Sequence, residues 1–176
     1  NPIGAESTDA ERQAVAELAR RHDLWVLADE AYFEMRYSGT SRSIAALDGM
    51  AERTVILYTF SKKFAMTGWR LGCAVAPREV SAVFGTLNTN NESCTTHFVQ
   101  WAGVEGIRGD QSGPRAIRRE LQARRDACAA ALNDMAGVSV AVPNATFYLF
   151  PDVTDAMARK AIGDLSTFAQ EALHAT

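Results

Sequence analysis

The sequence is 176 residues long, and its 18 basic and 21 acidic side chains give a formal net charge of −3 at neutral pH. Hydrophobic residues make up 47% and charged residues 22%, which is typical of a globular protein and excludes a disordered chain or a collagen-like repeat. No apolar run is long enough to cross a bilayer, and the acidic balance disfavours nucleic acid as a partner. The three cysteines show no disulfide or metal-ligand spacing, so we expect no metal site and a reducing, cytoplasmic location.

The first part of the sequence alternates between predicted helices and short apolar strands. Residues 9–22 have an acidic start, apolar residues at helical spacing and a basic end, which is typical of an amphipathic helix. Three unbroken apolar runs favour strands that are buried on both faces of a parallel sheet: 24–28, 54–58 and 71–76. Helical patterns predict two further helices, over 78–91 and 94–108.

The second part follows a break with turn chemistry over residues 109–114. A long helix is predicted beyond this break, followed by two strands, 138–142 and 146–150, and a last helix that begins near Asp164. The order of elements changes from α/β to α+β at the break. We therefore expect a domain boundary there, between a domain of residues 1–110 and one of residues 111–176.

Polar side chains gather where the first two predicted strands end. They are an acid, a phenol, two hydroxyls, two amines and a guanidinium, supplied by Asp29, Tyr32, Thr59, Ser61, Lys62, Lys63 and Arg70. Ligands of open parallel α/β sheets bind just beyond the carboxyl ends of the strands. A lysine amine can attack a carbonyl, and an arginine with hydroxyls can hold a phosphate. The set therefore suits an anionic ligand that carries a carbonyl group.

Four motifs in this order and spacing resemble the class I and II aminotransferases, pyridoxal-phosphate (PLP) enzymes of fold type I in the aspartate aminotransferase superfamily. They are Asn1-Pro2-x-Gly4, Asp29-x-x-Tyr32, Ser61-Lys62 and Gly68-Trp69-Arg70-Leu71-Gly72. Residues 143–150 are similar to a strand of the family's small domain, so the resemblance covers almost the whole chain. It implies an α/β fold: part of a large domain with a mainly parallel sheet flanked by helices, then part of a smaller α+β C-terminal domain.

The resemblance also implies individual roles. Lys62 matches the lysine that holds PLP as a Schiff base and moves a proton, although Lys63 is its rival on chemistry alone. Asp29 matches the carboxylate that faces the pyridine nitrogen, and Tyr32 and Asn1 match groups that hydrogen-bond the phenolic oxygen. The family's phosphate-binding groups are matched by Thr59, Ser61 and Arg70. The implied catalytic residues are Lys62, Asp29 and Tyr32.

We expect both ends of the chain to be cuts through a longer protein. The sequence opens without an initiator methionine or a signal peptide, and its last residues continue a helical pattern without a cap. The family's phosphate-binding glycine loop and ring-stacking aromatic residue would precede Asn1, and the arginine that binds the substrate carboxylate would follow Thr176. The segment alone is therefore expected to be inactive.

The resemblance implies ping-pong transfer of an amino group from an L-amino acid to a 2-oxo acid by a homodimer, without a nucleic-acid or membrane partner. Two alternatives keep the cofactor: a C–S lyase or decarboxylase-like reaction of the same fold, and a non-catalytic PLP-binding sensor domain of a transcription regulator. A nucleotide-binding oxidoreductase is disfavoured because no GxGxxG motif follows a strand. The identity of the substrates stays open.

Overall fold

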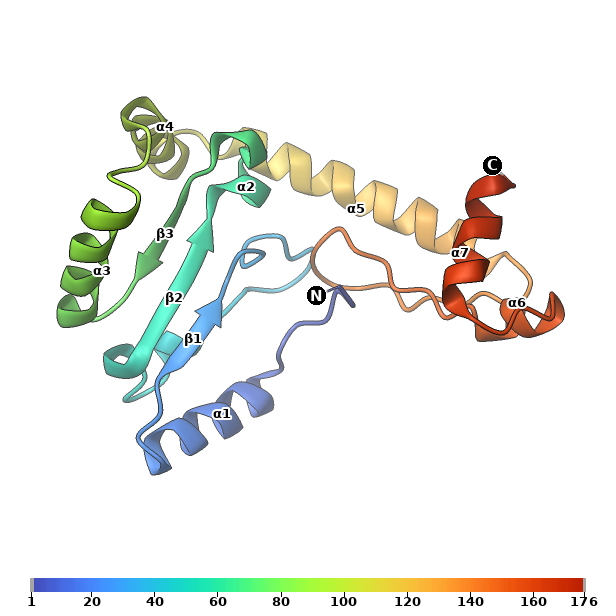
Figure 1. Cartoon of the computed structure of the whole chain (residues 1–176), viewed down its shortest axis with the longest axis horizontal. Coiled ribbons are helices and arrows are strands. Elements are labelled where there is room, and N and C mark those ends of the chain that lie inside the picture. Colours follow the sequence, from blue (N-terminus) through green and yellow to red (C-terminus); the bar gives the residue numbers. More distant parts are fainter. Residues whose placement is uncertain (1, 176) are drawn as a thin grey trace. The chain divides into compact units, whose positions relative to one another are not determined.

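The computed structural model describes residues 2–175, which form two compact units. The larger unit comprises Glu6–Arg119, and the smaller unit combines the residues up to Ala5 with those from Glu120 onward. The boundary therefore falls inside the long helix α5 (Ser112–Asn133; Figure 1). The domain division expected from sequence, 1–110 and 111–176, stays a prediction.

The larger unit is built around a mixed sheet with the strand order β1-β2-β3 (Figure 1). β1 (Val26–Asp29) pairs in parallel with β2 (Thr54–Thr59), and β2 pairs antiparallel with β3 (Gly72–Val75). The long connection between β1 and β2 permits the crossover that a parallel pair needs, whereas a compact loop joins β2 to β3.

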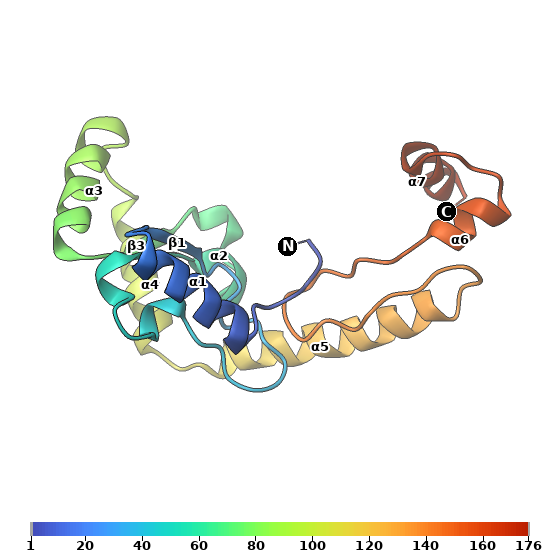
Figure 2. The ribbon, with the colours of Figure 1, turned by 90° about the horizontal axis from the view of Figure 1, so that it is seen from below.

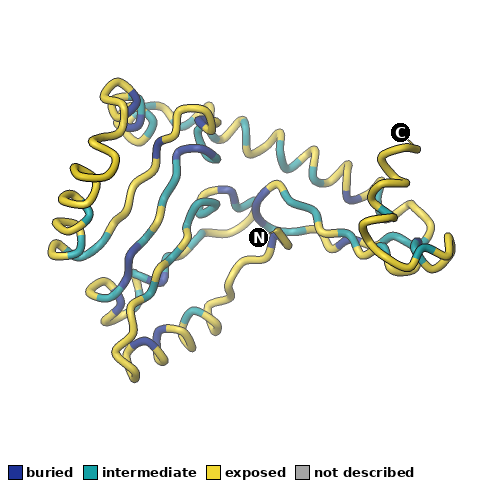
Figure 3. The backbone as a smooth tube through the Cα atoms, viewed as in Figure 1, coloured by how far each residue is buried: buried dark blue, intermediate teal, exposed yellow. Residues whose placement is uncertain are grey.

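The predicted α/β fold is confirmed: all three predicted strands are present, and β1 and β2 pair in parallel as expected. The expectation that the third strand is also parallel and that the strands are buried on both faces is wrong. β3 runs antiparallel and is exposed at all four residues, and β1 alternates between half-buried and exposed positions (Figure 3). A short apolar run reports neither the direction of its neighbour nor what covers its faces. Both depend on the connections and on the rest of the fold.

Helix α1 (Asp9–Arg21) packs against β1 through one of two small cores (Figures 1 and 2). The helix begins where sequence predicted, because Thr8 and Glu11 form a capping box: Thr8 Oγ1 accepts from the Glu11 N–H, and the Glu11 carboxylate accepts from the Thr8 N–H. The core is formed by Ala16, Ala19, Ile44 and Met50, with Val26, Ala28 and Leu47 packed against it.

The second core lies beneath the loop that joins β2 to β3. It contains Phe60, Met66, Leu71 and Val99. The last of these belongs to α4 (His97–Arg108), which follows α3 (Arg78–Asn91); both helices were predicted. The remaining helical elements of this unit are short: η1 (Ile44–Ala46), η2 (Ala51–Arg53), α2 (Phe60–Lys63) and η3 (Thr67–Trp69).

The smaller unit contains α6 (Thr154–Arg159) and α7 (Leu165–His174) besides most of α5. The two strands predicted over 138–142 and 146–150 are wrong, because only an isolated bridge between Ser139 and Asp152 forms there. The Asn133 side chain binds both backbone groups of Val140, and Thr146 has a φ of 65° that interrupts an extended chain. The last helix does begin where predicted, with Asp164 as its N-cap.

Among residues 2–175, no helix combines the length and apolar character needed to cross a membrane. Within the same residues, no group of three His, Cys, Asp or Glu side chains could hold a metal ion.

Candidate functional site

The parallel strands β1 and β2 bring two groups of predicted site residues to the same edge of the sheet. Asp29 ends β1 opposite Leu57, and Thr59 ends β2 two residues later. The Glu30 N–H donates to the Leu57 carbonyl at 2.9 Å, so the chain leaves β1 while still bonded to β2. Residues that follow these two strand ends are therefore neighbours, as expected for the carboxyl edge of a parallel pair.

Asp29 and Tyr32 are placed by a tight turn that follows β1. Asp29 is exposed, and its Oδ1 accepts a hydrogen bond from the Ala31 N–H at 3.1 Å. The Met35 N–H donates to the Tyr32 carbonyl at 2.9 Å, and Tyr32 is half-buried. Asp29 thus presents an exposed carboxylate at the sheet edge, and Tyr32 follows in the same turn.

Thr59 and Ser61 are organised by the first turn of α2. Thr59 is the N-cap of this helix, and its hydroxyl accepts from the Ser61 N–H at 3.2 Å. The two hydroxyl oxygens lie 3.0 Å apart, which provides two polar groups at one point. Lys62 follows in the same turn, and its Nζ lies 5.6 Å from the centroid of the Tyr32 ring. The structure thus brings Tyr32 and Lys62 into contact.

Arg70 lies next to this turn because β3 returns beside the end of β2. Thr59 is opposite Gly72 in the sheet, and the Phe60 N–H donates to the Leu71 carbonyl at 3.1 Å. Arg70 itself has a φ of 54°, in the left-handed region, and its Nη1 donates to the Thr67 carbonyl at 2.8 Å. Arg70 is exposed.

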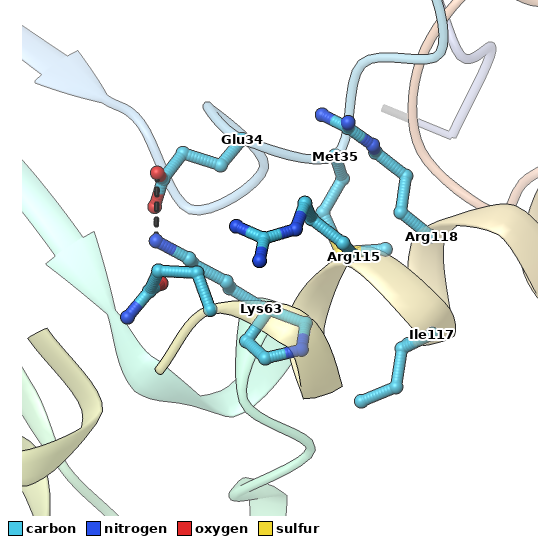
Figure 4. Close-up of a pocket in the computed structure, with 8 residues that line it drawn as sticks. Glu34, Met35, Lys63, Arg115, Ile117 and Arg118 are labelled. Atoms are coloured by element: carbon cyan, nitrogen blue, oxygen red, sulfur yellow. Dashed lines mark hydrogen bonds and ion pairs between the residues drawn. The ribbon is translucent and has the colours of Figure 1, made fainter. Parts of the chain in front are cut away.

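Lys63 points toward different partners than Lys62 does. Its Nζ forms an ion pair with Glu34 Oε1 at 2.7 Å (Figure 4). The other oxygen of Glu34 accepts a hydrogen bond from the Tyr58 hydroxyl at 2.9 Å. Burial, reinforced by the Glu34 carboxylate, raises the pKa of Tyr58 above its ordinary value. The hydroxyl therefore stays protonated and donates.

Sequence reasoning did not single out Glu34 or Tyr58. The only signal was positional: Glu34 lies two residues after Tyr32, and Tyr58 directly precedes Thr59. Asn1 lies outside the described residues. The other six predicted residues all lie at the ends of β1 and β2 or in the loop between β2 and β3.

The chemistry of these six groups fits PLP. A carboxylate, a phenol and an amine suit the pyridine ring and its aldehyde, and two hydroxyls with a guanidinium suit a phosphate dianion. A carboxylate is a poor neighbour for a phosphate, and Asp29 lies at the end of β1 whereas the phosphate-type donors follow β2.

Comparison with known proteins shows which protein family the chain resembles. Residues 1–173 match the family model for aminotransferase class I and II. Over 158 residues, the chain is 40% identical to aromatic-amino-acid aminotransferase 2 of Thermococcus litoralis. The matched region covers 88% of this chain and 40% of that protein. It is 37% identical to an aspartate aminotransferase of Pyrococcus abyssi, with the same coverage of both proteins. The chain thus spans about two fifths of the length of these relatives.

Solved structures show the same similarity. An N-succinyldiaminopimelate aminotransferase from Mycobacterium tuberculosis superposes with a TM-score of 0.87 at 31% identity, covering 98% of this chain and 44% of that one. An aromatic aminotransferase from Pyrococcus horikoshii superposes with a TM-score of 0.80 at 37% identity, covering 86% and 41%. Both the fold and the sequence are therefore similar to one family along nearly the whole chain.

Proposed function

Because the chain belongs to the class I and II aminotransferases, we propose that it supplies the PLP-binding part of an enzyme that moves an amino group from an L-amino acid to a 2-oxo acid. The observation that supports this most is the meeting of Asp29 and Tyr32 with Thr59, Ser61 and Lys62 at one sheet edge. When bound there, PLP supplies an electron sink for the electrons released from the substrate Cα.

The residues of this chain have distinct proposed tasks. Lys62 holds the cofactor through its amine, and Lys62 Nζ takes and returns the proton of the substrate Cα. The Asp29 carboxylate keeps the pyridine nitrogen protonated, and the Tyr32 hydroxyl donates to the phenolic oxygen. The phosphate is bound by the Thr59 and Ser61 hydroxyls and the Arg70 guanidinium.

Lys62 is preferred over Lys63 because the two amines have different surroundings. Lys63 is committed to Glu34 in an ion pair, whereas Lys62 lies over the Tyr32 ring beside the Thr59–Ser61 turn. An amine that must react as a nucleophile cannot also remain in a 2.7 Å ion pair. The ion pair disfavours Lys63 as the nucleophile, and Lys62 holds the motif position, directly after Ser61 and eight residues before Arg70.

The complete enzyme is proposed to be a homodimer in the cytoplasm. Cys73, Cys94 and Cys128 are all free thiols, which is consistent with a reducing compartment. Relatives include aromatic-amino-acid, aspartate and arginine–pyruvate aminotransferases, so family membership leaves several amino-acid substrates open.

Covalent attachment of PLP tests the proposal directly. The protein is incubated with PLP, reduced with borohydride and digested, and the modified lysine is located by mass spectrometry. We expect attachment at Lys62, loss of attachment in Lys62→Ala and retention in Lys63→Ala. Attachment at Lys63, or none at either residue, would contradict the assignment.

Substrate turnover tests the reaction type. Single L-amino acids are added, without an acceptor, to the PLP-loaded complete enzyme rather than to this segment. We expect stoichiometric release of a 2-oxo acid and conversion of the cofactor to pyridoxamine phosphate. Release of ammonia and pyruvate instead would indicate the lyase reaction, and the absence of any conversion would favour the sensor domain.

A further inference from the structure

The larger unit contains a cavity of about 290 Å³ beside the start of α5. Its walls come from the turn after β1, from α2 and from the beginning of α5. Among the described residues, none of the six that we assign to PLP lines this cavity. A ligand bound in it would therefore occupy a site separate from the proposed cofactor site.

Positive charge exceeds negative charge on the walls of the cavity. Three cationic side chains line it, those of Lys63, Arg115 and Arg118, together with one carboxylate, that of Glu34. The Lys63 and Glu34 charges already neutralise each other in an ion pair of 2.7 Å. The excess therefore resides on the two arginines of α5.

Neither of these arginines is committed to a strong partner. Arg115 Nη2 lies 3.7 Å from Asp110 Oδ1, and both side chains are more than half exposed, so this ion pair is weak. The same Asp110 oxygen accepts a hydrogen bond from the Ser112 N–H at 3.0 Å, which keeps the carboxylate at the start of α5. The Arg118 guanidinium has no hydrogen bond or ion pair within residues 2–175. Both guanidinium groups are therefore available to a ligand.

The position of the two arginines on α5 favours a bound anion. They are three residues apart on one helix face, and Figure 4 shows the Arg115 side chain extending from α5 toward the Glu34–Lys63 pair. Both belong to the first two turns of the helix, which begins at Ser112. The dipole makes this end of a helix positive, so it disfavours cations and favours anions. An anion between the arginines would offset their mutual repulsion and the unfavourable effect of the dipole.

Apolar side chains also line the cavity. Met35 is buried, and Pro114 and Ile117 are half-buried. The volume of about 290 Å³ is at the lower end of the range of about 300–1,000 Å³ that is usual for small-molecule sites. An inorganic anion would fill little of this volume and would leave the apolar side chains without contact. The walls therefore suit an organic ligand with a short carbon skeleton.

We propose that this cavity binds a small organic dianion. Its negative groups pair with the guanidinium groups of Arg115 and Arg118, which bind carboxylates and phosphates through paired N–H donors. Its carbon skeleton packs against the apolar side chains. Dicarboxylates and phosphate monoesters share this chemistry. The inference goes beyond the proposed function, because it assigns a second ligand site that shares no residue with the first.

Protection from an arginine reagent tests this proposal one residue at a time. The complete enzyme, freed of unbound PLP, is treated with phenylglyoxal, and mass spectrometry gives the modification rate of each arginine. We expect succinate to slow the modification of Arg115 and Arg118 by roughly fivefold once most of the cavity is occupied. Arg119 is the matched control, because it is exposed next to Arg118 and does not line the cavity. The modification rate of Arg119 should not change.

Two further probes identify the class of dianion. Protection by either succinate or methyl phosphate supports the site. Stronger protection by succinate assigns a dicarboxylate as the ligand, and stronger protection by methyl phosphate assigns a phosphate monoester. Propionate carries a single negative charge and should protect much less than the better of the two dianions. Protection by propionate as strong as that by the dianions would overturn the proposal.

Variants separate a defined site from loose association of anions with surface charge. In Arg118→Gln the dianions should no longer protect Arg115, whereas in Arg119→Gln the protection of Arg115 should remain. Retained protection of Arg115 in Arg118→Gln, equal protection of Arg119 in the wild type, or no protection by either dianion would overturn the proposal. If Arg118→Gln does not fold, the comparison of Arg115 with Arg119 in the wild type still decides the question.

The result is also independent of the proposed function. Each arginine is measured separately, and neither Arg115 nor Arg118 is assigned to PLP. Failure of PLP to attach to Lys62 would refute the proposed function and leave the protection of Arg115 and Arg118 to be judged by itself.

Discussion

At the end of β1, Asp29 is exposed and its Oδ1 accepts a hydrogen bond from the Ala31 N–H. Asn in place of Asp29 keeps an acceptor oxygen at this position, so Asp29→Asn changes the charge and preserves the turn. In the complete enzyme proposed above, we expect the variant to bind PLP and to release 2-oxo acid from an L-amino acid more slowly, by on the order of a thousandfold. Rapid-mixing absorbance measurements give this rate, and near-normal turnover would remove Asp29 from the mechanism.

Glu30, the next residue, provides a prediction about stability and pH. Burial raises the pKa of Glu30, only partly offset by a hydrogen bond from Ser43. Because the folded-state pKa exceeds the unfolded value, the ionised carboxylate destabilises the fold above that pKa, and the penalty disappears as pH falls below the unfolded value. Glu30→Gln should therefore stabilise the protein at pH 7, by no more than about 0.5 kcal/mol given its partial exposure.

Urea denaturation at several pH values checks this expectation. The advantage of Glu30→Gln over the wild type should shrink as pH falls toward 4. A constant advantage at all pH values would show that the carboxyl charge is not the cause.

Among the helices, α4 has two glycines with different surroundings. A Cβ at Gly103 would lie 2.6 Å from Leu71 Cδ2, inside the core beneath the β2–β3 loop, whereas at Gly106 the nearest atom is 3.4 Å away in Phe64. Gly103→Ala should lower the free energy of unfolding by about 1 kcal/mol, because Leu71 must move. Gly106→Ala should raise it by about 0.5–1 kcal/mol, because alanine favours the helix.

The pair of variants is its own control, because both replace a glycine by alanine in the same helix. Urea denaturation midpoints with unchanged slopes give the two values. Equal effects of the two substitutions would mean that α4 does not pack on Leu71 as described.

Sequence patterns predicted those elements whose signals are local. The capping box of Thr8 and Glu11 marks the start of α1, and Asp164 marks the start of α7. The two segments predicted as strands had the right apolar residues. In the first, the Asn133 side chain binds both backbone groups of Val140, and in the second, Thr146 has a φ of 65° that interrupts an extended chain. The Asn133–Val140 contact joins residues in different elements, so no periodicity could reveal it.

In the candidate site too, sequence predicted the residues with local signals but missed a contact between distant segments. Its motifs are short and continuous, and the placement of Tyr32 beside Lys62 agrees with their expected proximity. The Glu34–Lys63 pair was missed because it joins two segments that are far apart in the sequence. Glu34, in the turn after β1, can pair with Lys63 of α2 only once β1 and β2 have paired.

At the scale of the whole molecule, the larger unit leaves many large apolar side chains exposed. They include Trp25, Leu27, Val75, Phe98 and Trp101. Contiguous apolar surface on a protein usually marks an interface or an aggregation-prone region. Because these large apolar side chains are exposed, the larger unit is expected to bind apolar probes strongly.

Fluorescence of the apolar dye ANS checks this prediction. We expect the chain to enhance the dye's fluorescence in native buffer and to associate as its concentration rises, which sedimentation would detect. Trp101→Gln should reduce both effects, whereas Leu173→Gln, in α7 of the smaller unit, should change them less. Absence of dye binding would mean that these side chains are covered in solution.

The two pairings of β2 differ greatly in the length of chain that they close. The antiparallel pairing joins Thr59 to Gly72 across one compact loop, while the parallel pairing must bring Val26 to Thr54. A loop of few residues closes sooner, and loses less conformational entropy, than a loop of many residues. During folding, the residues that we propose bind the phosphate, Thr59, Ser61 and Arg70, should therefore be assembled before Asp29 and Tyr32 join them. A refolding chain would then form the proposed phosphate site before the proposed site for the pyridine ring.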